Sequence, residues 1–453
     1  MKEVFIIQDN LENKISYYHL LAFLIMLPFD MFYSELILIS LLAHTLIHLK
    51  KAKILSLSKP FFVLSSIYLL TIICSVHSVD RQQAFNDFGK HLAILLFPFI
   101  FSVTNLNVEK YKSPLLKAFA TICVLTSLYL FIDAFRIIQY NKLPFAYIIN
   151  PAFTNHNFSS PIELHATYFS MYISLSLMVL LHLFIKSSKK TQRILYTACI
   201  IILLLALIQL ASRAVIIATL LIINFALPFF LLHKPARRNF IICSLLLSSL
   251  AILSVTTIDS FKKRLVTELK KDLQKPETGF QTFESRASRW KIALKLIEQA
   301  PIIGYGSGSE GKILKEKYYQ NRMYVSYLNE LNAHNEYLSI MLNSGAIGLI
   351  IYLYLLTTGF INLFRKRDFF FASFLIIIVV VSVSENILDT NKGVFFFGFF
   401  FSFFAWPISK YKLIGFPFAK HKQDFIPNKN EITLEQKDNS QTARIENVDD
   451  LKS

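Results

Sequence analysis

Histidine and arginine side chains stand beside apolar segments of this chain, where ionisable groups are rare unless they have a function. His334 precedes the long apolar stretch in AHNEYLSIMLNSGAIGL (333–349), and Arg213 lies between apolar runs in LASRAVII (210–217). A neutral imidazole can take a proton from a hydroxyl, and a guanidinium can bind two phosphate oxygens at once. The two residues therefore indicate base and phosphate-binding chemistry. For each, the alternative is a side chain that only sits at a membrane interface.

A second pair of arginines falls in an amphipathic pattern. In SRASRWKIALKLIEQAP (285–301), apolar residues recur at i, i+3, i+4 and i+7 from Trp290, which predicts a helix that ends near Pro301. Arg289 and Trp290 lie three and four residues after Arg286, so they share its side near the helix start. Such arginines suit a phosphate group. The alternative is a solvated face of a helix whose apolar side packs on the rest of the protein.

The segment PIIGYGSGSEG (301–311) follows directly. It lacks the Gly-Lys-Ser/Thr ending of a P-loop, and a soluble strand–turn–helix context for a dinucleotide fingerprint is missing. Backbone N–H groups near Gly304 and Gly306 could hold an anion. A flexible turn is the interpretation that the sequence favours.

A further histidine, His165, lies two residues after Glu163 in PIELHATYFSMY (161–172). We consider two interpretations of His165: a hydrogen-bonded histidine at the membrane interface, or a catalytic histidine. The sequence contains no H-E-x-x-H motif, and acids such as Asp80, Asp87 and Glu330 are dispersed along it. We therefore expect a reaction that needs no metal and no other cofactor.

Composition determines which elements must position these residues. The 453 residues are 54% hydrophobic and only 17% charged, with a mean hydropathy of +0.47. A soluble domain is about a quarter charged, so we predict an all-α polytopic membrane protein. The twelve expected spans are 15–29, 32–48, 60–76, 88–104, 114–138, 163–185, 193–210, 213–233, 239–257, 335–363, 369–385 and 393–408.

Charge in the short loops predicts the orientation. Basic loops such as KKAK (50–53), HKPARR (233–238) and RKR (365–367) all fall on one side, which places both termini in the cytoplasm. The net charge of +17 largely reflects this bias, so it does not indicate nucleic-acid binding. The expected regions are nine N-terminal spans in 1–257, a helical loop on the outer side in 258–334, three spans in 335–408 and a disordered tail in 409–453. The loop is itself basic, which suggests an anionic partner.

Taken in order, these motifs resemble the O-antigen ligase family of polytopic glycosyltransferases. The resemblance rests on the outer SRA at Arg213, the Arg–Trp helix with its Pro-x-x-Gly-x-Gly turn, the His-Asn motif at His334, and LHATYFS (164–170). It covers about residues 160–360. The N-terminal spans match in hydropathy only.

The resemblance implies a metal-independent, inverting transfer of a glycan from an undecaprenyl-diphosphate carrier to lipid A–core. This would occur at the periplasmic face of the bacterial inner membrane, with membrane lipid around the protein. His334 would be the general base. The expected substrate-binding residues are Arg213, Arg286, Arg289, His165 and Asn335, supported by Trp290, Gly304, Gly306 and Glu163. A polysaccharide polymerase and a protein O-oligosaccharyltransferase of the same superfamily are alternatives, and a solute transporter is a more distant one.

Overall fold

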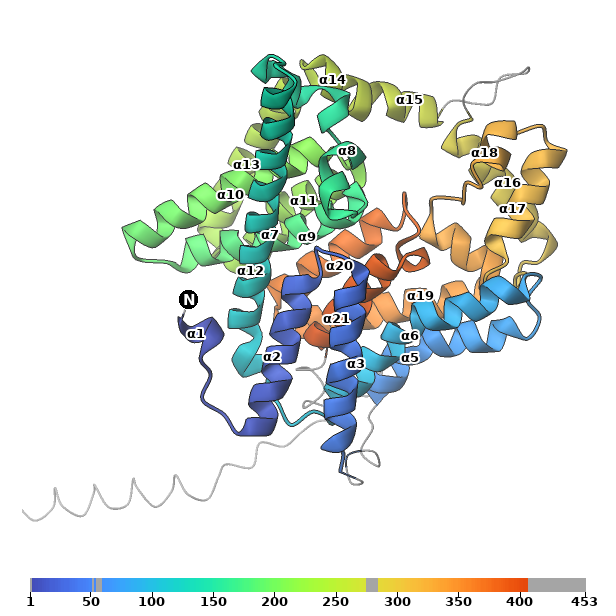
Figure 1. Ribbon diagram of the computed structural model, residues 1–453, viewed down its shortest axis with the longest axis horizontal. Helices are drawn as coiled ribbons and strands as arrows, with labels where there is room; N and C mark the ends of the chain where they lie inside the picture. Colours follow the sequence, from blue (N-terminus) through green and yellow to red (C-terminus); the bar gives the residue numbers. More distant parts are fainter. Residues whose placement is uncertain (1, 51–52, 54–58, 274–283, 406–453) are drawn as a thin grey trace, which may run out of the picture. The chain divides into compact units, whose positions relative to one another are not determined.

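The computed structural model describes residues 2–50, 53, 59–273 and 284–405. All regular elements in these ranges are helical (Figure 1), which confirms the expected all-α class. Seven of the described helices are long and apolar enough to cross a membrane, and four are shorter apolar helices. The chain is therefore a polytopic membrane protein, and the expected number of twelve crossings stays a prediction.

Each expected span nevertheless coincides with a helix. The helices of spanning length are α6 (Arg81–Val103), α7 (Val108–Tyr140), α9 (Ala166–Lys186), α10 (Lys190–Leu210), α11 to α12 (Arg213–Leu231, π-helical over Ile222–Ala226), α13 (Lys234–Thr256) and α19 (Glu336–Lys366). The four shorter ones are α3 (Met31–Ile47), α5 (Lys59–Ser75), α20 (Phe369–Val381) and α21 (Asn391–Ala405). The first expected span coincides with α2 (Leu11–Met26). The break expected between the spans 15–29 and 32–48 is present. Asp30, in this break, caps α3, and its carboxylate accepts the Phe32 N–H at 2.8 Å.

Phenylalanine-rich α21 lies at the centre of the helix packing. Its residues from Gly393 to Ala405 are buried, as expected of a helix that is apolar on every side. Its rings contact α6, α7 and α20, with Phe399 at 5.4 Å from Phe97 and Phe400 at 5.1 Å from Phe119. By contrast, α13 leaves large apolar side chains such as Leu247 uncovered (66% exposed), as a surface in contact with lipid does.

The region between α13 and α19 is helical as well. Its helices are α14 (Asp259–Lys262), a π-helical turn (Lys263–Thr267), α15 (Glu268–Leu273), α16 (Arg286–Gln299), α17 (Glu310–Gln320) and α18 (Tyr324–Leu328). Short helical turns also occur at α1 (Lys2–Phe5), α8 (His156–Ser159), Phe145–Ile149, Pro151–Phe153, Ser160–Ile162 and Ile387–Asp389. The predicted tail, 409–453, lies outside the described residues. The proposed region boundaries stay predictions.

Candidate functional site

Four of the predicted site residues line one cavity of about 270 Å³. Arg213, Arg286, Arg289 and His334 surround it, and we call it the arginine pocket. Its remaining lining residues are Glu268, Lys271, Asp272 and Leu331. The arginines and the histidine come from segments more than 40 residues apart, so the fold rather than local sequence brings them together.

Helix starts position the arginines. Ala211 ends α10 in the left-handed conformation (φ 48°), and after this two-residue turn Arg213 is the first residue of α11. Arg286 and Arg289 occupy the first turn of α16, which Ser285 caps by accepting the Ser288 N–H at 3.1 Å. The predicted helix and its shared arginine side are therefore present.

A carboxylate links two of the guanidinium groups. Asp272 Oδ2 lies 2.6 Å from Arg213 Nη2 and 3.6 Å from Arg286 Nε. On its other side, Arg286 donates from Nη1 to the Ser384 carbonyl at 2.7 Å, and its Nη2 lies 3.9 Å from Glu385 Oε1. The two arginines thus already hold an anionic group between them.

Some guanidinium N–H groups in the arginine pocket remain without a hydrogen-bond acceptor after these contacts. Among the described residues, Arg213 Nη1 and Arg289 Nε are buried and have no hydrogen-bond acceptor. Arg289 is only 5% exposed, and this burial lowers the pKa of its guanidinium from the ordinary value. Buried donors without acceptors cost free energy, so this arrangement favours an anionic ligand that accepts from them.

His334 has an unusual backbone and a carboxylate partner. Its φ of 47° is in the left-handed region, which non-glycine residues adopt rarely and often at functional sites. Its N–H donates to Asn332 Oδ1 at 3.0 Å, and its Nδ1 lies 3.4 Å from Glu385 Oε2. If Nδ1 carries the proton that Glu385 accepts, Nε2 is the atom with a lone pair for a substrate proton.

Glu385 is fitted to orient this histidine. Burial raises the pKa of its carboxyl, but the hydrogen bond from His334 and the nearby positive charges outweigh burial and lower it from the ordinary value. Glu385 is therefore ionised at neutral pH. Sequence reasoning missed it because the expected span 369–385 ran through this position, whereas α20 ends at Val381.

Other predicted residues hold the His334 segment in place. Asn335 caps α19, accepting the Leu338 N–H at 3.1 Å and donating to the Val383 carbonyl at 3.0 Å. Trp290 Nε1 donates to the Ala333 carbonyl at 2.8 Å. The described contacts of Asn335 and Trp290 are thus with the protein itself, and their predicted substrate contacts stay untested.

His165 lies near this group but does not line the arginine pocket. It caps α9 through Nδ1, which accepts the Thr167 N–H at 3.3 Å, and its ring centre lies 4.1 Å from that of His156. It is among the groups that lower the pKa of Glu385 from its ordinary value, which places it within electrostatic reach. Glu163 is exposed, with a left-handed φ of 51°, and it lines no described pocket of the site.

The glycine turn is a tightly packed joint, unlike the flexible turn that the sequence favoured. At Gly304 (φ 65°) a Cβ would lie 2.6 Å from the Leu342 carbonyl oxygen, and at Gly306 (φ 94°) 2.3 Å from Ser78 Cα. Only glycine permits these approaches. The Gly306 N–H donates to the Asn343 carbonyl at 3.0 Å, so this donor is already used within the protein.

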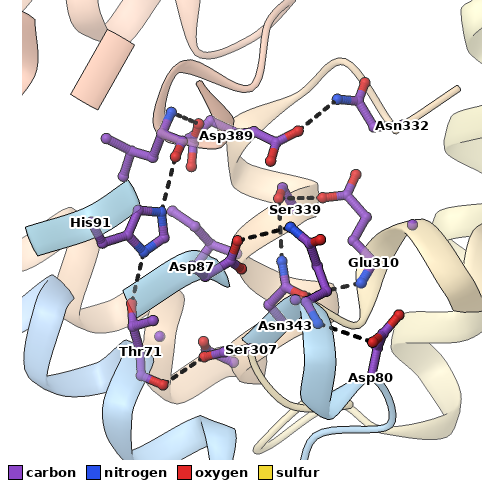
Figure 2. A pocket seen from close by; sticks show the side chains of 18 of the residues that line it. Thr71, Asp80, Asp87, His91, Ser307, Glu310, Asn332, Ser339, Asn343 and Asp389 are labelled. Carbon is purple, nitrogen blue, oxygen red and sulfur yellow. Dashed lines mark hydrogen bonds between the residues drawn. The ribbon is translucent and has the colours of Figure 1, made fainter. Parts of the chain in front are cut away.

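A larger cavity of about 610 Å³ (Figure 2) is also lined by residues of segment 330–334. Asn332 lines it, whereas the neighbouring Leu331 and His334 line the arginine pocket. Its charged lining residues are Asp80, Asp87, Glu310, Glu330, Glu336 and Asp389, with Lys312 and Lys315. We call this cavity the acidic pocket. The acids that the sequence presents as dispersed, including Asp80, Asp87 and Glu330, therefore come together.

Glu310 connects the acidic pocket to His334. Its buried carboxyl accepts the Ala333 N–H at 2.9 Å and a hydrogen bond from Ser339, and Asn386 Nδ2 donates to it at 3.2 Å. Asn386 Oδ1 in turn accepts the Asn335 N–H at 2.7 Å. Glu310 thus holds the chain on both sides of His334, and burial raises the pKa of this carboxyl to about 7. No three described His, Cys, Asp or Glu side chains form a metal-binding group.

Comparisons with known proteins agree with the motifs. The model of a family described as O-antigen ligase matches residues 198–353, a range that contains Arg213, Arg286, Arg289 and His334. An uncharacterized protein from Haemophilus influenzae (strain Rd) is 24% identical over 210 residues, 44% of this chain. The alignment spans 51% of that curated relative, about half its length. The α10–α19 region of the chain is therefore similar to the O-antigen ligase family.

Proposed function

We propose that the protein is an O-antigen ligase-type glycosyltransferase that moves a glycan from undecaprenyl diphosphate to lipid A–core. The observation that carries the proposal is the arginine pocket: three arginines and His334 meet in one cavity, with buried guanidinium donors still without acceptors. A diphosphate offers the oxygens that such donors require. The reaction would take place at the periplasmic face of the inner membrane, with both termini in the cytoplasm.

In the proposed reaction, His334 acts on the acceptor and the three arginines act on the donor. The acceptor hydroxyl gives its proton to His334 Nε2 while its oxygen forms a bond to the anomeric carbon of the glycan. The bond from that carbon to the diphosphate oxygen breaks, and undecaprenyl diphosphate leaves with the electron pair. Attack opposite the leaving group inverts the anomeric centre. Arg213, Arg286 and Arg289 stabilise the charge that grows on the diphosphate, which requires no metal.

The acidic pocket supports an acceptor subsite. Carboxylates and amides are good acceptors and donors for sugar hydroxyls, and Asn332 and Asn343 line the pocket beside the acids. Its negative charge disfavours a phosphate. We propose that an uncharged or amino-bearing sugar of lipid A–core enters here. This differs from the anionic partner that the basic loop suggested, because the loop contributes the acidic residues Glu310 and Glu330 to the pocket.

A deletion strain tests the proposal. Long glycans should disappear from lipid A–core and accumulate on the lipid carrier, and the native chain should restore them. His334→Ala should fail to restore them, while His48→Ala, an exposed histidine at the end of α3, should succeed. Core capped with one repeat would indicate a polymerase. An unchanged glycolipid profile with lost glycoproteins would indicate a protein O-oligosaccharyltransferase, and unchanged glycans throughout would overturn all three.

A further inference from the structure

A third cavity, of about 440 Å³, lies where the ends of several apolar helices meet. Its charged lining residues are Glu109, Lys112, Lys117, Lys186, Lys366, Arg367 and Asp368. They come from the first turns of α7, the end of α9, and the junction between α19 and α20. We call this cavity the basic pocket, because five cationic side chains face two acidic ones.

The basic pocket is separate from the proposed site of glycan transfer. The arginine pocket and His334 lie beside the start of α19 and the end of α20, whereas the basic pocket lies at the opposite ends of these helices. The 13 residues of α20 alone span about 20 Å at about 1.5 Å per residue. A ligand of the basic pocket therefore does not touch the reacting groups.

The acidic side chains leave much of the positive charge uncompensated. Asp368 caps α20, its Oδ1 accepting the N–H groups of Phe370 and Phe371 at 3.0 and 3.1 Å, and its Oδ2 pairs with Lys112. The charge of Lys112 is therefore offset by Asp368. Lys117 and Lys186 also line the cavity, so an anionic ligand would have two further cations to bind.

The rest of the lining of the basic pocket is mostly apolar, with one polar side chain that lacks a hydrogen-bond partner. The apolar part consists of Leu116, Val179, Leu183, Leu231, Phe369, Phe370 and Phe404. His182 lines the cavity too, and its Nδ1 is buried without a hydrogen-bond partner among the described residues. A ligand that combines a phosphate with hydrocarbon would match both the cationic rim and this wall, whereas a small soluble phosphate would leave the wall uncovered.

We propose that the basic pocket binds the phosphate headgroup of an anionic phospholipid, with the start of an acyl chain against Leu116 and Leu183. Basic residues on one side of a membrane protein are common. Here, however, they converge with apolar side chains and His182 on a single cavity between helix ends, which is the arrangement that binds anionic lipid headgroups.

The test uses the full chain in nanodiscs of neutral phosphatidylcholine, titrated with phosphatidylglycerol, with retained lipid measured by native mass spectrometry. The double variant Lys117→Gln/Lys186→Gln removes two cations of the basic pocket. Lys189→Gln/Lys190→Gln is the matched control. These exposed lysines lie just after the end of α9, which contributes Lys186 to the basic pocket, but they do not line the cavity. Gel filtration establishes that each variant is folded.

We expect the pocket variant to bind phosphatidylglycerol about thirtyfold more weakly than the native chain, equivalent to about 2 kcal/mol at about 1.4 kcal/mol per tenfold. The control should bind it as the native chain does. Equal binding by all three proteins, or equal loss in both variants, would overturn the proposal. Displacement of the lipid by millimolar inorganic phosphate would assign the site to a soluble phosphate compound instead.

Discussion

The buried carboxyl of Glu310 makes the stability of the protein depend on pH in a defined direction. Its pKa in the folded chain is about 7, against 4.5 for an unperturbed glutamate, because burial disfavours the charged form. The folded state therefore keeps this proton up to about pH 7, whereas the unfolded chain releases it near pH 4.5. The stabilisation is full below pH 4.5 and is lost as the pH rises through 7.

The size of this effect follows from the shift. About 2.5 pKa units at about 1.4 kcal/mol each correspond to about 3 kcal/mol. Glu310→Gln has the shape of the protonated side chain but cannot ionise. We expect the variant to match the native chain near pH 4.5 and to be more stable by up to about 3 kcal/mol near pH 8, because the native carboxyl is then charged and buried.

Thermal unfolding in detergent between pH 4.5 and 8 measures this difference, which should be a few degrees in Tm at the alkaline end. Glu316→Gln is the control, since Glu316 is exposed on the same helix, α17. It should follow the native chain at every pH. A Glu310→Gln variant that is less stable than the native chain by the same amount at every pH would refute the reasoning.

Three further substitutions test the site and its support. Glu385→Gln should lower kcat about a hundredfold with little change in KM, because His334 loses the carboxylate that orients it; unchanged kcat would contradict this role. Asp272→Asn should lower the donor KM several-fold, because the carboxylate competes for Arg213 and Arg286; a higher KM would mean that Asp272 instead positions the arginines. Gly306→Ala should destabilise the fold by about 3 kcal/mol in chemical unfolding, because its Cβ meets Ser78; Gly311→Ala, with open space around it, is the control, and equal stability of the two would contradict the packing argument.

Much of the helix layout could be predicted, because a membrane-spanning helix can be recognised from the apolar composition of its own segment. The motif residues could be recognised too, since Arg213 and His334 are unusual at the edges of apolar runs. Glu385 could not, because hydropathy extended the expected span through it. Its role depends on His334, which lies 51 residues earlier and in a different loop.

The acidic pocket was missed for a related reason. Asp87 lies on α6, Glu310 begins α17 and Asp389 follows α20, so no local spacing brings them together. Asp80 and Asp87 lie seven residues apart at the start of one helix, but this spacing alone did not suggest a cluster. Asp272 likewise looked like one charge among many in a loop of mixed charge, and its contact with Arg213 spans 59 residues.

The most direct test is glycan transfer by the purified chain in proteoliposomes that contain an undecaprenyl-diphosphate-linked glycan and lipid A–core. We predict that the native chain forms the glycosylated lipid A–core and releases undecaprenyl diphosphate in equal amount. Arg213→Ala and His334→Ala should each lose at least about a hundredfold in rate, while Arg193→Ala, an exposed arginine at the start of α10, should not. Full transfer rates from folded Arg213→Ala and His334→Ala proteins would contradict the assignment of the arginine pocket as the site of the reaction.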